Sequence, residues 1–362
     1  MSEDDEEVAL LGMKKRGAAP TATPSQGAEP TLHILANTGR PLGLVPEGPI
    51  ESLECFRRMV RWFQQKGLHL PTGLYQFLGE LWGTFILVFF IEMVGASSVF
   101  SGNLMGVWQV AIAEGLGVTI AIYMAAALSD AHLNPAVTCA LALFRRSPHR
   151  WHRLLLYPLA QLLGAFSAAA LSYGIWSPAI AYFEQQQNIT RGQPGSELTA
   201  SAFACYFPNP SWALPAATAD AVTTVPMALL CELIATAILM FAIMTLTDHR
   251  NHNIVNPKIT PVIIGLTVAV LISAFGSHTM AALNPARDFG PRLFTAIAGW
   301  GQIALPGPRN GFWVYIVGPI LGALVGALLY EILFFFPHYV QPLKLRRPPP
   351  TLDLSDGPLD FE

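Results

Sequence analysis

The chain has 362 residues, of which 52% are hydrophobic and only 12% charged, against the roughly 25% charged residues of soluble domains. So few charges cannot cover the surface of a soluble domain of this size, which favours an integral membrane protein. The net charge of −3 provides no basic surface for nucleic acid. The four cysteines form no CxxC pair, and none has a histidine at the spacing of a metal site, so we expect neither a disulfide scaffold nor a zinc module.

Both ends of the chain have the composition of disordered tails. Residues 1–70 start with an acidic run and continue rich in Pro, Gly, Ala and Thr, without the cationic start and apolar run of a signal peptide. Residues 339–362 include a proline run and an acidic end. We therefore predict that residues 71–338 form one membrane domain between two disordered tails.

Six apolar segments in this domain each approach the ~20 residues that a helix needs to cross a bilayer. They cover 74–96, 104–128, 154–175, 222–247, 259–276 and 311–335. Two shorter apolar segments, 133–144 and 283–298, follow the second and fifth spans and are too short to cross. We predict re-entrant half-helices there, with amphipathic surface helices as the alternative.

Lys and Arg are concentrated before the first and third spans, between the fourth and fifth, and after the last. The positive-inside rule then places both termini in the cytoplasm. The long loop 176–221 lies on the opposite side and carries a glycosylation sequon at Asn188. We expect the plasma membrane; an acidic dileucine pattern at Glu6–Leu11 makes a vacuolar or endosomal membrane the alternative.

An internal repeat relates the two halves of the domain. The run Ala131-His-Leu-Asn-Pro-Ala136 recurs 150 residues later as Ala281-Ala-Leu-Asn-Pro-Ala286. The first half covers residues 74–175 and the second covers residues 222–335. The first span of each half contains a glutamate, Glu80 in the first half and Glu232 in the second. Each half has three spans, and an odd number forces the halves into opposite orientations, as in inverted repeats that build a pathway at the bilayer midplane.

The repeated Asn-Pro-Ala triplets, Asn134-Pro135-Ala136 and Asn284-Pro285-Ala286, have a specific physical consequence. Asparagine is a strong N-cap, and proline is best tolerated in the first turn of a helix. Half-helices entering from opposite sides would bring two N-termini together, where their dipoles create positive potential. The asparagine amides could donate N–H groups to a passing neutral oxygen, while cations, hydronium included, would meet a barrier.

With these motifs the chain resembles the major intrinsic proteins, the aquaporin and aquaglyceroporin family, over about residues 74–335. The resemblance is closest to the glycerol-conducting branch, which includes the bacterial glycerol facilitators. It is carried by Gly115–Val118 with Ala121–Tyr123, Ala131–Thr138, Tyr206–Pro210 and Asn284–Arg292. Trp176, Asp288, Arg292 and Ile316 are similar to glycerol conductors, whereas Tyr315 stands where those usually have proline.

The resemblance implies an all-α, aquaporin-like fold of six transmembrane helices and two re-entrant half-helices in an inverted repeat. It assigns Arg287 to an outer selectivity filter, although an arginine that merely caps or pairs with Asp288 is the alternative. It assigns Glu80 and Glu232 to buried positions that hold the half-helix loops. It also implies a homotetramer with one pore in each subunit.

The chain departs from the family at this filter. Glycerol conductors place two aromatic side chains beside the arginine, and the matching positions here are Glu114 and Ala281, with Ile272 as the fourth filter residue. Glu114 and Arg287 could pair across a wide polar opening, or pair to narrow the pore and release it on protonation at acidic pH. In the third interpretation, Glu114 turns into the helix bundle and pairs elsewhere.

Two further acidic residues are unusual. Asp130 stands where the family usually has glycine, either as a solvated loop charge or paired with a basic residue of the loops. Glu92 is expected near the membrane interface at the external end of the first span.

The sequence therefore predicts a passive channel in a lipid bilayer for glycerol, water and other small neutral solutes. One alternative is a channel mainly for water, peroxide or urea, with pH-dependent gating by Glu114 and Arg287. Another is an alternating-access transporter, since inverted repeats also build those. The chain has no GxSxG or HExxH motif, so we do not expect an enzyme.

Overall fold

A computed structural model describes residues 62, 65, 71–103, 106–145, 150–212, 221–248 and 256–334. All of the secondary structure in these ranges is helical. The two predicted tails, 1–70 and 339–362, lie almost entirely outside the described residues.

Six long helices account for most of the described chain. They are α3 (Thr72–Ala96), α4 (Val107–Ala125), α6 (Arg150–Gln186), α9 (Val225–Thr247), α10 (Thr260–Thr279) and α12 (Val314–Phe334). Each belongs to a helical segment that is long and apolar enough to cross a membrane. The predicted all-α membrane fold with six transmembrane helices is therefore confirmed.

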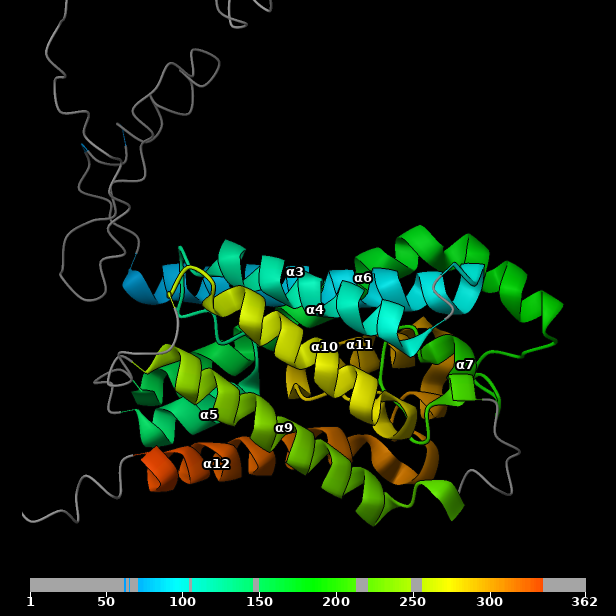
Figure 1. Ribbon diagram of the computed structural model, residues 1–362. Coiled ribbons are helices and arrows are strands. Elements are labelled where there is room, and N and C mark those ends of the chain that lie inside the picture. Colours follow the sequence, from blue (N-terminus) through cyan, green and yellow to red (C-terminus); the bar gives the residue numbers. More distant parts are fainter. Residues whose placement is uncertain are drawn as a thin grey trace, which may run out of the picture. The chain divides into compact units, whose positions relative to one another are not determined.

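The two short apolar segments form short helices in the interior of the bundle. The first is α5 (Pro135–Phe144) and the second is α11 (Pro285–Thr295), with a π-helical turn at Ala296–Trp300 after it. In Figure 1 both lie between the layer formed by α3 and α4 and the layer formed by α9 and α12. Re-entrant half-helices must be short and buried, as α5 and α11 are. The alternative prediction, that these two segments form amphipathic surface helices, is therefore wrong.

The helices pack in corresponding pairs, with α3 against α6 in the first half and α9 against α12 in the second. Helices α4 and α10 cross between the halves at Gly115 and Gly265, which are 150 positions apart, like the two Asn-Pro-Ala triplets. A methyl group added to Gly115 would come within 2.4 Å of the Gly265 carbonyl oxygen. Glycine is needed at this crossing because the two backbones touch.

The third span is longer than the predicted 154–175, because α6 continues to Gln186 and takes up the start of the predicted loop 176–221. Pro178 lies inside the helix and leaves the carbonyl of Gly174 without its usual donor. The hydroxyl of Ser177 donates to that carbonyl at 3.4 Å. This bond helps the helix continue past the proline. The rest of the loop contains α7 (Glu197–Ala200) and a 3-10 turn at Pro210–Trp212.

Candidate pore and outer filter

The two half-helices begin at the repeated asparagines. Asn134 caps α5 by accepting a hydrogen bond from the N–H of Ala136 at 2.9 Å. Asn284 caps α11 by accepting from the N–H groups of Ala286 at 3.0 Å and Arg287 at 3.3 Å. A proline follows each asparagine as the first helical residue, where its missing N–H costs no helical bond. Local sequence is thus sufficient to start both helices.

Each asparagine also holds the opposite half of the protein. The amide of Asn134 donates to the carbonyl of Leu283 at 2.9 Å, and the amide of Asn284 donates to the carbonyl of Leu133 at 2.7 Å. These reciprocal bonds join the two helix N-termini directly. An asparagine amide carries two N–H groups, so each of these bonds uses only one of the two donors. The sequence analysis did not predict this cross-link.

The loop before α5 is held by a buried carboxylate. Glu80 on α3 accepts from the N–H groups of His132 at 2.9 Å and Leu133 at 2.8 Å. It also accepts from the side chains of Ser129 and Gln161. Four donors satisfy this carboxylate, which would otherwise be costly inside a membrane.

The second loop repeats the arrangement. Glu232 on α9 accepts from the N–H groups of Ala282 at 3.0 Å and Leu283 at 2.9 Å. Four loop residues at equivalent positions have positive φ between 50° and 56°, namely Ala131, Leu133, Ala281 and Leu283. The left-handed region costs a non-glycine residue roughly 1–2 kcal/mol. The paired bonds to each glutamate offset this strain and turn successive N–H groups toward the same side.

Arg287 is the third residue of α11 and is buried to 6% exposure. Its Nη1 donates to the carbonyl of Phe203 at 2.9 Å, which ties it to the segment between α6 and α9. No motif in the sequence marks Phe203, because only its backbone oxygen takes part. The described structure contains no ion pair between Arg287 and Asp288, so the interpretation in which these two neighbours pair is wrong.

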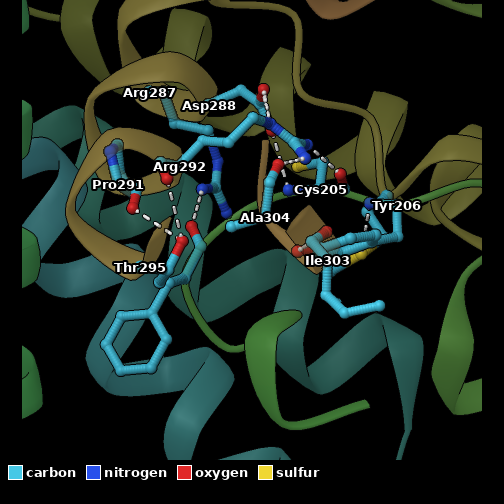
Figure 2. A network of polar contacts seen from close by, with 11 residues as sticks. Cys205, Tyr206, Arg287, Asp288, Pro291, Arg292, Thr295, Ile303 and Ala304 are labelled. Carbon is cyan, nitrogen blue, oxygen red and sulfur yellow. Dashed lines mark hydrogen bonds and ion pairs between the residues drawn. The ribbon is translucent and has the colours of Figure 1, made fainter. Parts of the chain in front are cut away.

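Asp288 pairs instead with Arg292 on the next turn of α11, with Oδ2 to Nε and Oδ1 to Nη2 both at 2.9 Å (Figure 2). The N–H of Cys205 donates to Asp288 Oδ1 at 2.8 Å. Arg292 donates to the carbonyls of Cys205 and of Ala304, the latter at 2.9 Å. This buried ion pair therefore ties the segments around residues 205 and 304 to the half-helix that carries Arg287.

The other predicted filter residues are also buried, with Glu114 at 7%, Ile272 at 6% and Ala281 at 5% exposure. Glu114 is on α4, and no hydrogen bond or ion pair joins its side chain to that of Arg287 in the described structure. The close Glu114–Arg287 ion pair assumed in both hypotheses is thus not formed. Both side chains are long, and Arg287 is held by Phe203 instead.

Two of the remaining residues typical of glycerol conductors have defined positions. The indole N–H of Trp176 points to the sulfur of Met93 at 3.2 Å, and Ile316 is partly buried on α12. Beside Ile316, Tyr315 is buried, and Arg292 lies 5.5 Å from its ring centre.

Glu92 is a residue that the sequence analysis misplaced. It is fully buried, and neither carboxylate oxygen has a hydrogen-bond partner in the described structure. The helical segment of α3 continues past Glu92 through a π-helical turn to Ser101, so this residue lies within the segment and not at its end. A charged residue within an apolar span was the available signal, because such residues are costly and usually functional.

At the other end of the pore, Asp130 pairs with Arg153 at 2.9 Å and accepts a hydrogen bond from Tyr157 at 2.9 Å. These residues adjoin a cavity of about 270 Å³ whose lining includes Asp130, Arg153 and His132. Burial lowers the pKa of His132, whose Nδ1 lies 3.1 Å from the hydroxyl of Thr138. Of the two interpretations of Asp130, the paired one is correct.

Comparison with known proteins agrees with this geometry. The family described as Major intrinsic protein matches residues 68–330. The glycerol uptake facilitator protein of Pseudomonas aeruginosa is 44% identical over 265 residues, which cover 73% of this chain and 90% of that protein. The glycerol uptake facilitator protein of Escherichia coli is 41% identical and covers 71% and 86% of the two chains.

A relative named for a different solute is nearly as similar. The propanediol uptake facilitator of Salmonella typhimurium is 42% identical, over 70% of this chain and 90% of that protein. Among solved structures, the aquaglyceroporin from Plasmodium falciparum superposes with a TM-score of 0.61 at 27% identity. The match covers 73% of this chain and 98% of that one.

Proposed function

The chain belongs to the major intrinsic protein family, and we propose that it is a passive transmembrane channel for glycerol, water and other small neutral solutes. The observation that carries this proposal is the reciprocal bonding of Asn134 and Asn284 to the carbonyls of Leu283 and Leu133. It joins two helix N-termini in the interior and leaves one amide donor of each asparagine free for a solute.

Transport through this arrangement needs no covalent step, and we propose no enzymatic activity and no cofactor. A neutral hydroxyl oxygen accepts from the two amides, which replaces part of its hydration. The N-termini of α5 and α11 each carry about half a positive charge, so cations and hydronium are repelled there. Glu80 and Glu232 keep the two loops in the shape that this requires.

Arg287 is proposed to form the outer filter together with Glu114, Ile272 and Ala281. The bond to Phe203 orients its guanidinium, and the Asp288–Arg292 pair fastens the surrounding segments. Without the two aromatic side chains of typical glycerol conductors, the filter has small or polar side chains at those positions. We therefore expect the filter to discriminate weakly by solute size, so that both water and small polyols such as glycerol pass through the channel.

The assembly and orientation are further parts of the proposal. We propose a homotetramer with one pore in each subunit, in the plasma membrane, with both termini in the cytoplasm. The distribution of Lys and Arg supports this orientation.

The test is stopped-flow light scattering on reconstituted vesicles, comparing osmotic water flux with glycerol uptake at neutral and mildly acidic pH. Rapid uptake that rises linearly with glycerol concentration supports the channel. Water flux without glycerol uptake would contradict the proposed solute. Saturable uptake coupled to an ion gradient would instead indicate an alternating-access transporter. A flux that changes on acidification would support the alternative in which Glu114 gates the channel.

A further inference from the structure

The hydroxyl of Thr138, in the first turn of α5, takes part in three hydrogen bonds. It donates to the carbonyl of Asn134 at 3.0 Å and accepts from the amide nitrogen of Gln161 at 3.2 Å. That nitrogen also donates to the Glu80 carboxylate at 2.7 Å, which fixes the orientation of the amide. The third partner is Nδ1 of His132, at 3.1 Å. Because the single hydroxyl proton already points to Asn134, Nδ1 of His132 carries a proton and donates it.

This assignment makes the other ring nitrogen of His132 a hydrogen-bond acceptor. Burial lowers the pKa of His132, so the ring is neutral, and a neutral imidazole with its proton on Nδ1 has none on Nε2. The ring packs edge-on against Tyr157, with the two ring centres 5.0 Å apart. No described residue forms a hydrogen bond with Nε2. His132 therefore has an acceptor available for a ligand.

Asp130, two residues earlier in the same loop, supplies a second acceptor. Its Oδ2 receives both the hydroxyl of Tyr157 and Nη1 of Arg153, each at 2.9 Å. Its Oδ1 has no partner among the described residues, and the side chain is 42% exposed. Asp130 and His132 both line the cavity of about 270 Å³ at the inner end of the pore. This cavity therefore has two acceptors without donors.

The cavity adjoins the point where the two half-helices meet. His132 and Thr138 of its lining flank the first Asn-Pro-Ala triplet. The carbonyl of Leu133, next to His132, accepts from the amide of Asn284 at 2.7 Å. The rest of the lining comes from the last turns of α5 and α9 and the first turn of α6, which the predicted orientation places on the cytoplasmic side. A solute that has passed the asparagines thus reaches this cavity before it leaves the pore.

The remaining lining residues limit the kind of ligand. Some of them are apolar, namely Leu141, Ala142 and Ile243. The charges are balanced, because Arg153 pairs with Asp130. Arg145, the second arginine of the lining, pairs with the buried Asp248 at 3.1 Å. The volume is below the ~300–1,000 Å³ of pockets for drug-sized molecules. The ligand that fits is therefore small and neutral, donates hydrogen bonds and has an apolar part.

We propose that this cavity is an inner binding site for small polyols, in which Oδ1 of Asp130 and Nε2 of His132 accept two solute hydroxyl groups. The apolar side chains contact the carbon edge of the solute. A polyol loses water on entering the pore, and the two acceptors replace part of that hydration. Asp130 and His132 are then specificity-determining residues, at the inner end of a pore whose proposed outer filter has no aromatic side chain. The site deepens the proposed channel function and rests on it.

The experiment measures glycerol permeability and osmotic water permeability in vesicles reconstituted with the full chain. Their ratio corrects each variant for its amount of folded protein. His132→Asn keeps an amide N–H near the position of Nδ1 but has no atom at Nε2, whereas His132→Gln reaches that position with its carbonyl oxygen. We expect the glycerol-to-water ratio to fall about fivefold in His132→Asn, the equivalent of one neutral hydrogen bond. His132→Gln should recover part of the loss.

Asp130→Asn tests the second acceptor. Its amide keeps one acceptor oxygen, which the bonds to Tyr157 and Arg153 already occupy, so the ratio should again fall about fivefold. Glu197→Gln is the matched control, because it removes a carboxylate of α7, outside the cavity, and should leave the ratio unchanged.

Two results would overturn the inner site alone. One is glycerol conduction with the same ratio in the unaltered protein, His132→Asn and Asp130→Asn. The other is an equal fall in His132→Asn and His132→Gln, which would assign the effect to the shape of the loop and not to the acceptor. Water flux without glycerol uptake in the unaltered protein would instead contradict the proposed solute, and the polyol site with it.

Discussion

The side chain of Asn284 makes three hydrogen bonds that serve two roles, and the two roles can be separated by substitution. Its Oδ1 caps α11 through two backbone N–H groups, while its Nδ2 holds the carbonyl of Leu133. Aspartate can keep the cap, because a carboxylate is an equally good N-cap. It cannot donate to Leu133, and it adds negative charge where the dipoles oppose cations.

Asn284→Asp should therefore fold but weaken the cation barrier. We expect water flux to persist, with a cation current that the unaltered protein does not show, measured as the conductance of planar bilayers. Asn284→Ala is the matched control, because it loses cap and donor without adding charge and should cost about 1–2 kcal/mol of stability. If the cation conductance of Asn284→Ala is as large as that of Asn284→Asp, the added negative charge is not the cause of the current.

The Asp288–Arg292 pair makes a prediction about stability. Both side chains are essentially excluded from solvent, so Asp288→Asn leaves the Arg292 guanidinium buried without a counter-charge. Breaking a buried pair in this way typically costs about 3–5 kcal/mol.

Thermal unfolding in detergent should show a marked drop for Asp288→Asn. The double variant Asp288→Asn with Arg292→Met should recover part of it, because no unpaired charge remains. A double variant no more stable than Asp288→Asn would contradict this account of the pair.

At the scale of elements, the crossing of α4 and α10 depends on Gly115 and Gly265. Gly115→Ala places a methyl group against the backbone of α10, which cannot give way as a flexible side chain could. Overpacking of this kind costs about 1–3 kcal/mol. Gly174 on α6 is the matched control, because a methyl group there meets nothing within 4 Å.

Gly115→Ala should therefore lower the unfolding temperature, while Gly174→Ala should leave it unchanged or raise it, since alanine favours helix by about 1 kcal/mol. Both are read by the same thermal unfolding assay. Equal effects of the two substitutions would mean that the contact between α4 and α10 does not limit stability.

At the scale of the whole molecule, orientation in the membrane can be tested at Asn188. This residue lies exposed in the turn after α6, and the sequon places a threonine at Thr190, which is also exposed. With cytoplasmic termini, this turn faces the outside or a lumen, where oligosaccharide is attached.

Expression in a eukaryotic cell should give a protein whose electrophoretic mobility rises after treatment with an N-glycosidase. Asn188→Gln should abolish the shift. Asn209 is the internal control, because the proline after it excludes glycosylation. A shift that persists in Asn188→Gln would place the sugar elsewhere, and an unglycosylated protein whose tagged termini label from outside would reverse the orientation.

The features that sequence alone predicted are those encoded locally. Span length and hydropathy predicted the six helices, since each depends on about 20 neighbouring residues. The repeated triplets predicted both half-helices, because an N-cap and a first-turn proline act within one turn. The resemblance carried by these motifs also identified the family.

The partners of the buried charges were decided by tertiary structure. Arg287 is held by a carbonyl 84 positions away, and Asp288 pairs with Arg292 and not with its neighbour. No ion pair joins Glu114 to Arg287 in the described structure, although the family resemblance suggested one, and Glu92 is fully buried, although its position in the span suggested the interface. Electrostatic partners depend on which distant backbone and side-chain groups packing brings within a few ångströms, and no local pattern encodes that distance.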